Sequence, residues 1–283
     1  MGISADLFGL THPGRVRESN EDQFLIAELV KSLLIQQTSL PPDDHTRLFG
    51  GPPGKLLLVA DGMGGTRGGK RASRLVVETV TQYVLDTMHW FFRLQQGEEA
   101  DLVDELKAGL TVCQKAVAAA AAERPEHERM GTTLTLAYLL WPRAYVIHVG
   151  DSRAYLYRGG RLEQITRDQT VAQRMVDQGV LPPEQAEETR WAHVLSSVIS
   201  ARPESLDPSI YRLTMQAGDT LLLCTDGLGK PVSDAEVARH LAAVPAEGAK
   251  VVAGRLVAAA NDAGGPDNVT VVVAHFQSAP EGV

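Results

Sequence analysis

Cysteine is scarce in this chain, and its scarcity limits the kinds of structure to expect. Only Cys113 and Cys224 occur among the 283 residues, and both stand in apolar surroundings. They are predicted to be buried thiols rather than a disulfide, which fits a reducing compartment such as the cytoplasm. No spacing of cysteine and histidine is typical of a zinc site.

Long apolar runs and basic tracts are also missing. The longest apolar stretch, 134–149, is broken by Pro142 and Arg143, so no membrane span is expected. Residues 1–10 lack the charged start and apolar core of a secretory signal. The net charge of −8, with no basic tract, argues against nucleic acid as a partner. An acidic surface repels polyanions, so a site that handles phosphate must supply its own cations.

What is present is an ordinary globular composition, with 44% hydrophobic and 22% charged residues. Low-complexity linkers and repeats are absent, and one domain over residues 1–283 is expected. Antiparallel-looking runs of strands and paired helices favour a layered α+β sandwich. Strands are predicted at 23–26, 56–60, 133–140, 144–149, 153–157, 162–165, 209–213, 220–225 and 269–276, and helices at about 68–94, 101–123, 234–244 and 246–262.

Several local signals accompany these elements. Gly159 and Gly160 predict a tight hairpin turn, and Ser233 with Glu236 three residues later predicts a capping box. Residues 41–54 are expected to form an exposed loop, and 168–205 to be helical, polar and rich in turns.

Four aspartates each follow an apolar, strand-like run: Asp61, Asp151, Asp226 and Asp267. Carboxylates gathered from distant parts of a chain suggest a site for hard divalent cations, and so metal-assisted chemistry on phosphate. The alternative is turn chemistry, since Asp-Gly at 226 and Gly-Gly-Pro-Asp-Asn at 264–268 are both turn signals. Each aspartate alone could stand in an ordinary turn, but it is much less probable that all four do so by coincidence.

The segment 17–22 (RESNED) precedes another apolar run. Arg17 offers planar, bidentate hydrogen bonding to phosphate oxygens, and Glu21 and Asp22 are candidates to hold metal-bound waters. Taken alone, the hexapeptide is more typical of a solvated charged loop.

The ordered set of motifs resembles the protein phosphatase 2C family, the metal-dependent serine/threonine phosphatases, and especially its bacterial members. The resemblance covers a core of about 6–276. It is carried by RESNED at 17–22, VADGMGG at 59–65, MGTT at 130–133, VGDSRA at 149–154, ITRD at 165–168, Gly218 with Asp219, CTDGL at 224–228 and PDNVT at 266–270.

The resemblance implies a four-layer α+β sandwich, with two antiparallel β-sheets packed together and flanked by pairs of α-helices. It also implies two Mn²⁺ or Mg²⁺ ions. Asp61 would bridge them, Asp226 and Asp267 would complete one, and the Gly62 carbonyl with waters held by Glu21 and Asp22 would complete the other. A third, weaker ion is implied at Asp151, shared with Asp226.

The implied reaction is hydrolysis of phosphoserine and phosphothreonine by a metal-bridging hydroxide that attacks phosphorus directly, with Arg17 binding the phosphate. Partners would be phosphorylated proteins, including serine/threonine kinases and their substrates, and a monomer is expected. Two alternatives are a non-enzymatic module that binds phosphoproteins, and a hydrolase of small phosphoesters.

The chain departs from the family pattern at Met63, where many eukaryotic members have a histidine proposed as the acid for the leaving group. Bacterial members commonly have methionine there. Residues 168–205 correspond to the mobile flap of bacterial members and match it poorly. His193, within that segment, is more typical of a structural or exposed residue than of a catalytic one.

Overall fold

The computed structural model describes residues 3–30, 32–34, 47–49, 53–64, 68–87, 99–124, 127–202 and 206–279. Most of the predicted loop 41–54 and the end of the predicted helix 68–94 lie outside these ranges.

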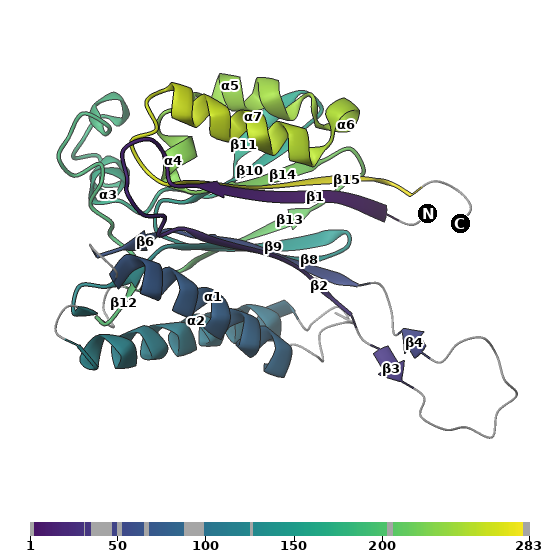
Figure 1. Cartoon of the computed structure of the whole chain (residues 1–283), viewed down its shortest axis with the longest axis horizontal. Coiled ribbons are helices and arrows are strands. Elements are labelled where there is room, and N and C mark those ends of the chain that lie inside the picture. The colour runs from purple at the N-terminus through teal and green to yellow at the C-terminus, as the bar shows by residue number, and fades with distance from the viewer. Residues whose placement is uncertain are drawn as a thin grey trace, which may run out of the picture.

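Two five-stranded antiparallel sheets form the middle of the molecule (Figure 1). The strands of the first sheet, in spatial order, are β1 (Ile3–His12), β15 (Val269–Ser278), β14 (Thr220–Cys224), β10 (Arg153–Arg158) and β11 (Arg161–Gln164). Those of the second are β13 (Ser209–Thr214), β9 (Arg143–Val149), β8 (Leu134–Leu140), β5 (Gly54–Ala60) and β2 (Gln23–Leu29). A small sheet of β12 (Ile199–Ser200), β7 (Gly131–Thr132) and β6 (Gly62–Met63) lies at one end, and β3 (Ser32–Leu34) pairs with β4 (Arg47–Phe49).

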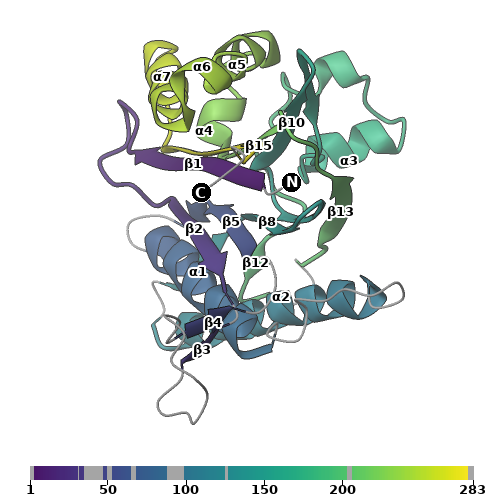
Figure 2. The same ribbon diagram turned by 90° about the vertical axis from the view of Figure 1, so that its right-hand side faces the viewer.

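Helices cover the outer face of each sheet, as Figures 1 and 2 show from two directions. The second sheet is covered by α1 (Gly68–Thr87) and α2 (Glu99–Ala122). The first is covered by α4 (Asp226–Gly229), α5 (Asp234–Leu241), α6 (Val244–Glu247) and α7 (Ala249–Asp262). The remaining helices, α3 (Val171–Asp177) and the short 3-10 helix η3 (Pro183–Gln185), belong to the segment 168–205. The predicted four-layer α+β sandwich is confirmed.

The layers are held together by three apolar cores. One lies between the second sheet and α1 with α2, one between the two sheets, and one between the first sheet and the C-terminal helices. Strand β5 contributes side chains to two of these cores, because successive side chains point to opposite faces of a strand. Leu56 and Leu58 point into the helix-side core, and Leu57 and Val59 into the core between the sheets.

Several predicted elements have different bounds in the structure. Strand β1 was not predicted, although it pairs along its whole length with β15. The predicted helix 234–244 ends at Leu241, and α6 is a separate turn with proline near its start. The last helix begins at Ala249 rather than 246, after Gly248 at φ 86°, a left-handed conformation that ends the preceding turn. Asp267 precedes strand β15 rather than following a strand, so the prediction that all four aspartates end strands was wrong for this residue.

Two of the local signals, the Gly159–Gly160 turn and the helix start at Ser233, are confirmed, whereas β4 and the first residue of β5 fall within the predicted loop 41–54. Gly159 and Gly160 have φ values of 54° and 83° in the β10–β11 turn, as a tight hairpin requires. The Ser233 hydroxyl accepts a hydrogen bond from the Glu236 amide at the start of α5. Both cysteines are buried free thiols, as predicted. None of the described helices combines the length and apolar character that a membrane crossing requires.

A buried histidine gives the fold a pH dependence. His148 lies in β9; its Nε2 donates to the Arg167 carbonyl oxygen (3.1 Å), and its Nδ1 lies 2.9 Å from the Thr135 hydroxyl. Burial lowers the pKa of His148 from 6.5 to about 4, outweighing the attraction of Asp168. The folded protein therefore keeps this ring neutral at a pH where the unfolded chain protonates it.

The free energy of unfolding should consequently fall as the pH drops from 6.5 towards 4, by about 3 kcal/mol from this group. Buried carboxylates with raised pKa values increase the free energy of unfolding on acidification, which is the opposite effect. The contribution of His148 is therefore measured by comparing the parent with His148→Gln. Chemical denaturation at pH 7.0, 5.5 and 4.5 should show the stability gap between them narrowing on acidification. A constant gap would contradict this assignment.

Candidate active site

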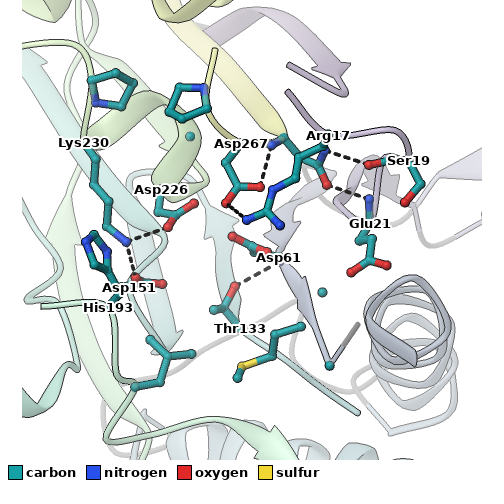
Figure 3. Close-up of a pocket in the computed structure, with 18 of the residues that line it drawn as sticks. Arg17, Ser19, Glu21, Asp61, Thr133, Asp151, His193, Asp226, Lys230 and Asp267 are labelled. Carbon is teal, nitrogen blue, oxygen red and sulfur yellow. Dashed lines mark hydrogen bonds and ion pairs between the residues drawn. The ribbon is translucent and has the colours of Figure 1, made fainter. Parts of the chain in front are cut away.

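A cleft of about 870 Å³ opens at the end of the sandwich where the β1–β2 loop, β6 and α4 meet (Figure 3). Six of the lining residues are acidic, and the basic residues among them are Arg17, Lys230 and His193. The lining consists of Arg17, Glu18, Ser19, Glu21, Asp61, Gly62, Met63, Gly64, Thr133, Asp151, His193, Leu195, Asp226, Gly227, Lys230, Pro231, Pro266, Asp267 and Asn268. The cleft therefore carries an excess of negative charge.

Strand ends position the central carboxylates. Asp61 follows β5 directly, and its backbone is held on both sides by Thr133: the Asp61 amide donates to the Thr133 hydroxyl (3.0 Å), and the Thr133 amide donates to the Asp61 carbonyl (2.9 Å). Asp226 begins α4 just after β14, and Asp151 follows β9. Because the two sheets end at the same place, these three residues face one cleft.

The β1–β2 loop brings the phosphate-binding candidate to the rim. The Asn268 side chain holds this loop: its Oδ1 accepts from the Glu21 amide (2.8 Å), and its Nδ2 donates to the carbonyls of Pro13 and Ser19 (2.9 Å each). Arg17 then reaches Asp267, with Nη2 2.7 Å from Oδ2, while remaining largely exposed. The guanidinium is therefore oriented but open to a ligand.

Asp22 lies beneath the cleft rather than in its wall. It is 2% exposed, and its Oδ2 accepts hydrogen bonds from the hydroxyls of Thr225 (2.8 Å) and Thr270 (2.7 Å). Its Oδ1 is buried and has no hydrogen-bond partner among the described residues, and the same holds for Oδ1 of Asp226. Unpaired buried carboxylate oxygens are costly unless a cation meets them.

Burial and mutual repulsion disfavour the charged form of the clustered acids. Burial raises the pKa of Asp22 to about 7 and that of Asp151 to about 6, and repulsion from Asp226 adds to both. The pKa of Asp61 is raised well above its ordinary value, first by burial and then by repulsion from Asp22, Asp226 and Asp151. Burial also raises the pKa of Glu21. These shifts show that the site favours positive charge, from protons or from cations.

Lys230 supplies part of that charge. Its Nζ donates to Oδ2 of Asp151 (2.9 Å) and to Oδ2 of Asp226 (2.6 Å), as Figure 3 shows. Burial alone would lower the pKa of Lys230, but the two carboxylates outweigh it and the pKa is raised. The lysine is therefore a fixed ammonium ion.

The donor set suits hard divalent cations. It consists of carboxylate and carbonyl oxygens, the ligands that Mg²⁺ and Mn²⁺ prefer, and two of its buried oxygens are unpaired among the described residues. In the part of the chain that the structure describes, no three acidic, histidine or cysteine side chains converge on a single point. Salt bridges to Arg17 and Lys230 occupy one oxygen each of Asp267, Asp151 and Asp226.

The structure thus brings the predicted site residues together. Arg17, Glu21, Asp61, Gly62, Asp151, Asp226 and Asp267 line the cleft, and Asp22 lies directly below it. Lys230 and the positioning role of Asn268 were not predicted from the sequence. The spacing of four residues between Asp226 and Lys230 was an available signal, because it places the two side chains on one side of a helical turn.

A glycine allows α4 to approach β15 closely enough to assemble the cleft. Gly227 is buried, and a Cβ added there would collide with the backbone carbonyl of Asn268. Gly227→Ala is expected to destabilise the fold by about 2 kcal/mol. Gly254→Ala, inside α7 with no atom within 4 Å of the added Cβ, should instead stabilise it by up to about 1 kcal/mol. Thermal denaturation of the two variants checks both signs, and equal effects would contradict the close approach.

Known proteins share this fold. The catalytic domain of the serine/threonine phosphatase PstP, solved in complex with two manganese ions, superposes with a TM-score of 0.74 at 32% identity, covering 98% of this chain and 100% of that one. The protein phosphatase 2C profile matches residues 35–254. The chain belongs to the protein phosphatase 2C family.

Two relatives by sequence come from bacteria. The serine/threonine protein phosphatase PstP of Mycobacterium tuberculosis is 38% identical over 221 residues, which are 78% of this chain and 40% of that protein. The protein phosphatase PhpP of Streptococcus pneumoniae is 30% identical over 218 residues, 77% of this chain and 84% of PhpP. The chain therefore spans less than half the length of the mycobacterial relative and most of the streptococcal one.

Proposed function

We propose that this protein removes phosphate from phosphoserine and phosphothreonine residues of proteins, using two Mn²⁺ or Mg²⁺ ions. The observation that carries the proposal is the cleft itself, in which clustered carboxylates face an oriented, exposed arginine. Family membership and the two manganese ions of the PstP catalytic domain support it.

In this proposal Asp61, at the centre of the cleft, would help to hold both ions, Asp226 and Asp267 would hold one of them, and the Gly62 carbonyl with waters bound by Glu21 and Asp22 would hold the other. Bound divalent cations would activate a water for attack on phosphorus and offset the charge on the phosphoryl oxygens. Arg17 would orient the phosphate through charge-assisted hydrogen bonds at the rim. Its bond to Asp267 aims the guanidinium before a substrate arrives, which reduces the entropy lost on binding.

The wider assignment is proposed on the same basis. One catalytic domain of residues 1–283 would act as a monomer in the cytoplasm on phosphorylated proteins, among them serine/threonine kinases and their substrates. Two buried free thiols agree with a reducing compartment. The segment 168–205 would contribute to substrate choice, because His193 and Leu195 bring it to the cleft wall.

The test is release of phosphate from a phosphothreonine peptide by the purified protein with Mn²⁺, with Mg²⁺ and with chelator. Phosphate release that requires metal is expected, at a rate well above that on small phosphoesters such as sugar phosphates. Faster turnover of the small esters would favour a metabolite hydrolase. Tight phosphopeptide binding without turnover, from folded protein loaded with metal, would favour a binding module.

A further inference from the structure

Lys230 lies in the cleft but has no part in the proposed reaction. Lys230 places a single ammonium group between Asp151 and Asp226, 2.9 Å and 2.6 Å from one oxygen of each. We propose that Lys230 acts as a resident cation that closes the Asp151–Asp226 pair to divalent metal, so that the cleft binds two divalent ions rather than three. This inference rests on the proposed function, because it concerns how many ions the same cleft holds.

The backbone beneath Lys230 is fixed. Its amide donates to the Asp226 carbonyl (3.0 Å), which closes the single turn of α4. The preceding carbonyl, of Gly229, accepts a hydrogen bond from Arg153 Nη1 (2.8 Å), and Arg153 is in turn held by Asp168. The lysine side chain therefore extends from a backbone position that hydrogen bonds hold close to Asp226.

The pair it joins is largely withdrawn from water. The side chain of Asp151 is 6% exposed and that of Asp226 is 16% exposed, against 30% for Lys230. Breaking a salt bridge in such a position leaves an uncompensated buried charge, which is strongly unfavourable. A divalent ion that approached both Oδ2 atoms would have to expel the ammonium first.

Without the lysine, the same two carboxylates would face each other with no cation between them. Two oxygens from separate carboxylates at the edge of a water-filled cleft are a binding site for a hard divalent ion. A neutral side chain at position 230 should therefore open a binding site that the parent protein lacks. The third ion that the family resemblance implies at Asp151 would have to enter where Lys230 lies.

Asp226 can bind Lys230 and a metal ion near Asp61 at the same time. Its Oδ2 is bonded to Lys230, whereas its Oδ1 is buried and free of hydrogen bonds to the described residues. The second oxygen is thus available to an ion near Asp61, whose pKa is raised partly by repulsion from Asp226. Lys230 removes one oxygen of Asp226 from the metal-binding set and leaves the other.

The experiment counts Mn²⁺ ions bound per chain, by equilibrium dialysis and elemental analysis, at a range of free Mn²⁺ concentrations. The parent, Lys230→Arg and Asp151→Asn should each bind two ions. Lys230→Met and Lys230→Gln should each bind a third, which disappears when Asp151→Asn is added. Two neutral variants are used so that the test stands even if one of them fails to fold, and circular dichroism checks the folding of each.

Three ions in the parent would overturn the inference, as would an unchanged count in both neutral variants or loss of an ion in Asp151→Asn alone. Two ions in the parent without phosphopeptide hydrolysis would refute the proposed function and leave the role of Lys230 standing. If instead Lys230 binds the substrate phosphate, its neutral variants would keep two ions and raise KM for the phosphopeptide, and the inference would fail.

Discussion

Replacing Asp61 with asparagine is expected to lower metal-dependent phosphate release from a phosphothreonine peptide roughly a thousandfold, or about 4 kcal/mol in the activation free energy. Asp61 lies at the centre of the acidic cluster, where its pKa is raised by burial and by repulsion from Asp22, Asp226 and Asp151. An amide offers one neutral carbonyl oxygen where the carboxylate offers two charged ones. It cannot bridge two cations with comparable strength.

The loss should come from chemistry rather than from unfolding. Removing one charge from a cluster of like charges relieves repulsion, so in chelator the variant should unfold at a temperature no lower than the parent's. Asp86→Asn, an exposed acid-to-amide change on α1, is the matched control and should keep full activity. An Asp61→Asn variant that is folded and active within tenfold of the parent would refute the two-ion assignment.

The second large effect is expected at Arg17. Arg17→Ala should lower kcat/KM for the phosphopeptide by about tenfold to a hundredfold, because a charge-assisted hydrogen bond contributes about 1.5–3 kcal/mol. Inorganic phosphate, as a product inhibitor, should bind correspondingly more weakly. Arg17→Lys should restore only part of the loss, since an ammonium lacks the planar pair of donors that matches a phosphate.

Arg74→Ala provides the control for removal of an arginine. Arg74 is exposed on α1 and paired with Glu78, with its Nε 2.7 Å from Oε1. Its replacement should leave steady-state kinetics unchanged. Should Arg17→Ala keep the parent's KM and its affinity for inorganic phosphate, the guanidinium would be a structural partner of Asp267 only.

The central acids could be predicted from local sequence because each stands beside a turn that its neighbours encode. Asp61 follows a run of apolar residues and precedes glycines and a helix, which a simple hairpin turn between two strands would not produce. Asp226 and Asp267 were ambiguous individually, since both stand in ordinary turn sequences. Their order along the chain, compared with the family pattern, resolved the ambiguity.

Other features depend on contacts between distant residues, which a local pattern does not report. Strand β1 lacks a clear alternation of buried and exposed residues: nine of its residues are half-buried and one is exposed. This reflects its place at the edge of the sheet, where its partner is the last strand of the chain. Asn268 follows Asp267 in a turn sequence, yet its side chain holds a loop about 250 residues earlier. No spacing within the sequence indicates that connection.

The sequence by itself indicated most of the larger helices and strands and a set of candidate acids, because apolar periodicity and turn chemistry act over a few residues. The tertiary structure decided how those acids are used. Packing the two sheets face to face, with their ends meeting at the cleft, buried Asp22 beneath it and left Asp61 lining it. The single turn of α4 brought the Lys230 ammonium to two carboxylates that follow different strands. Burial and charge compensation are properties of the assembled molecule, and they arise only when residues far apart in the chain share one low-dielectric site.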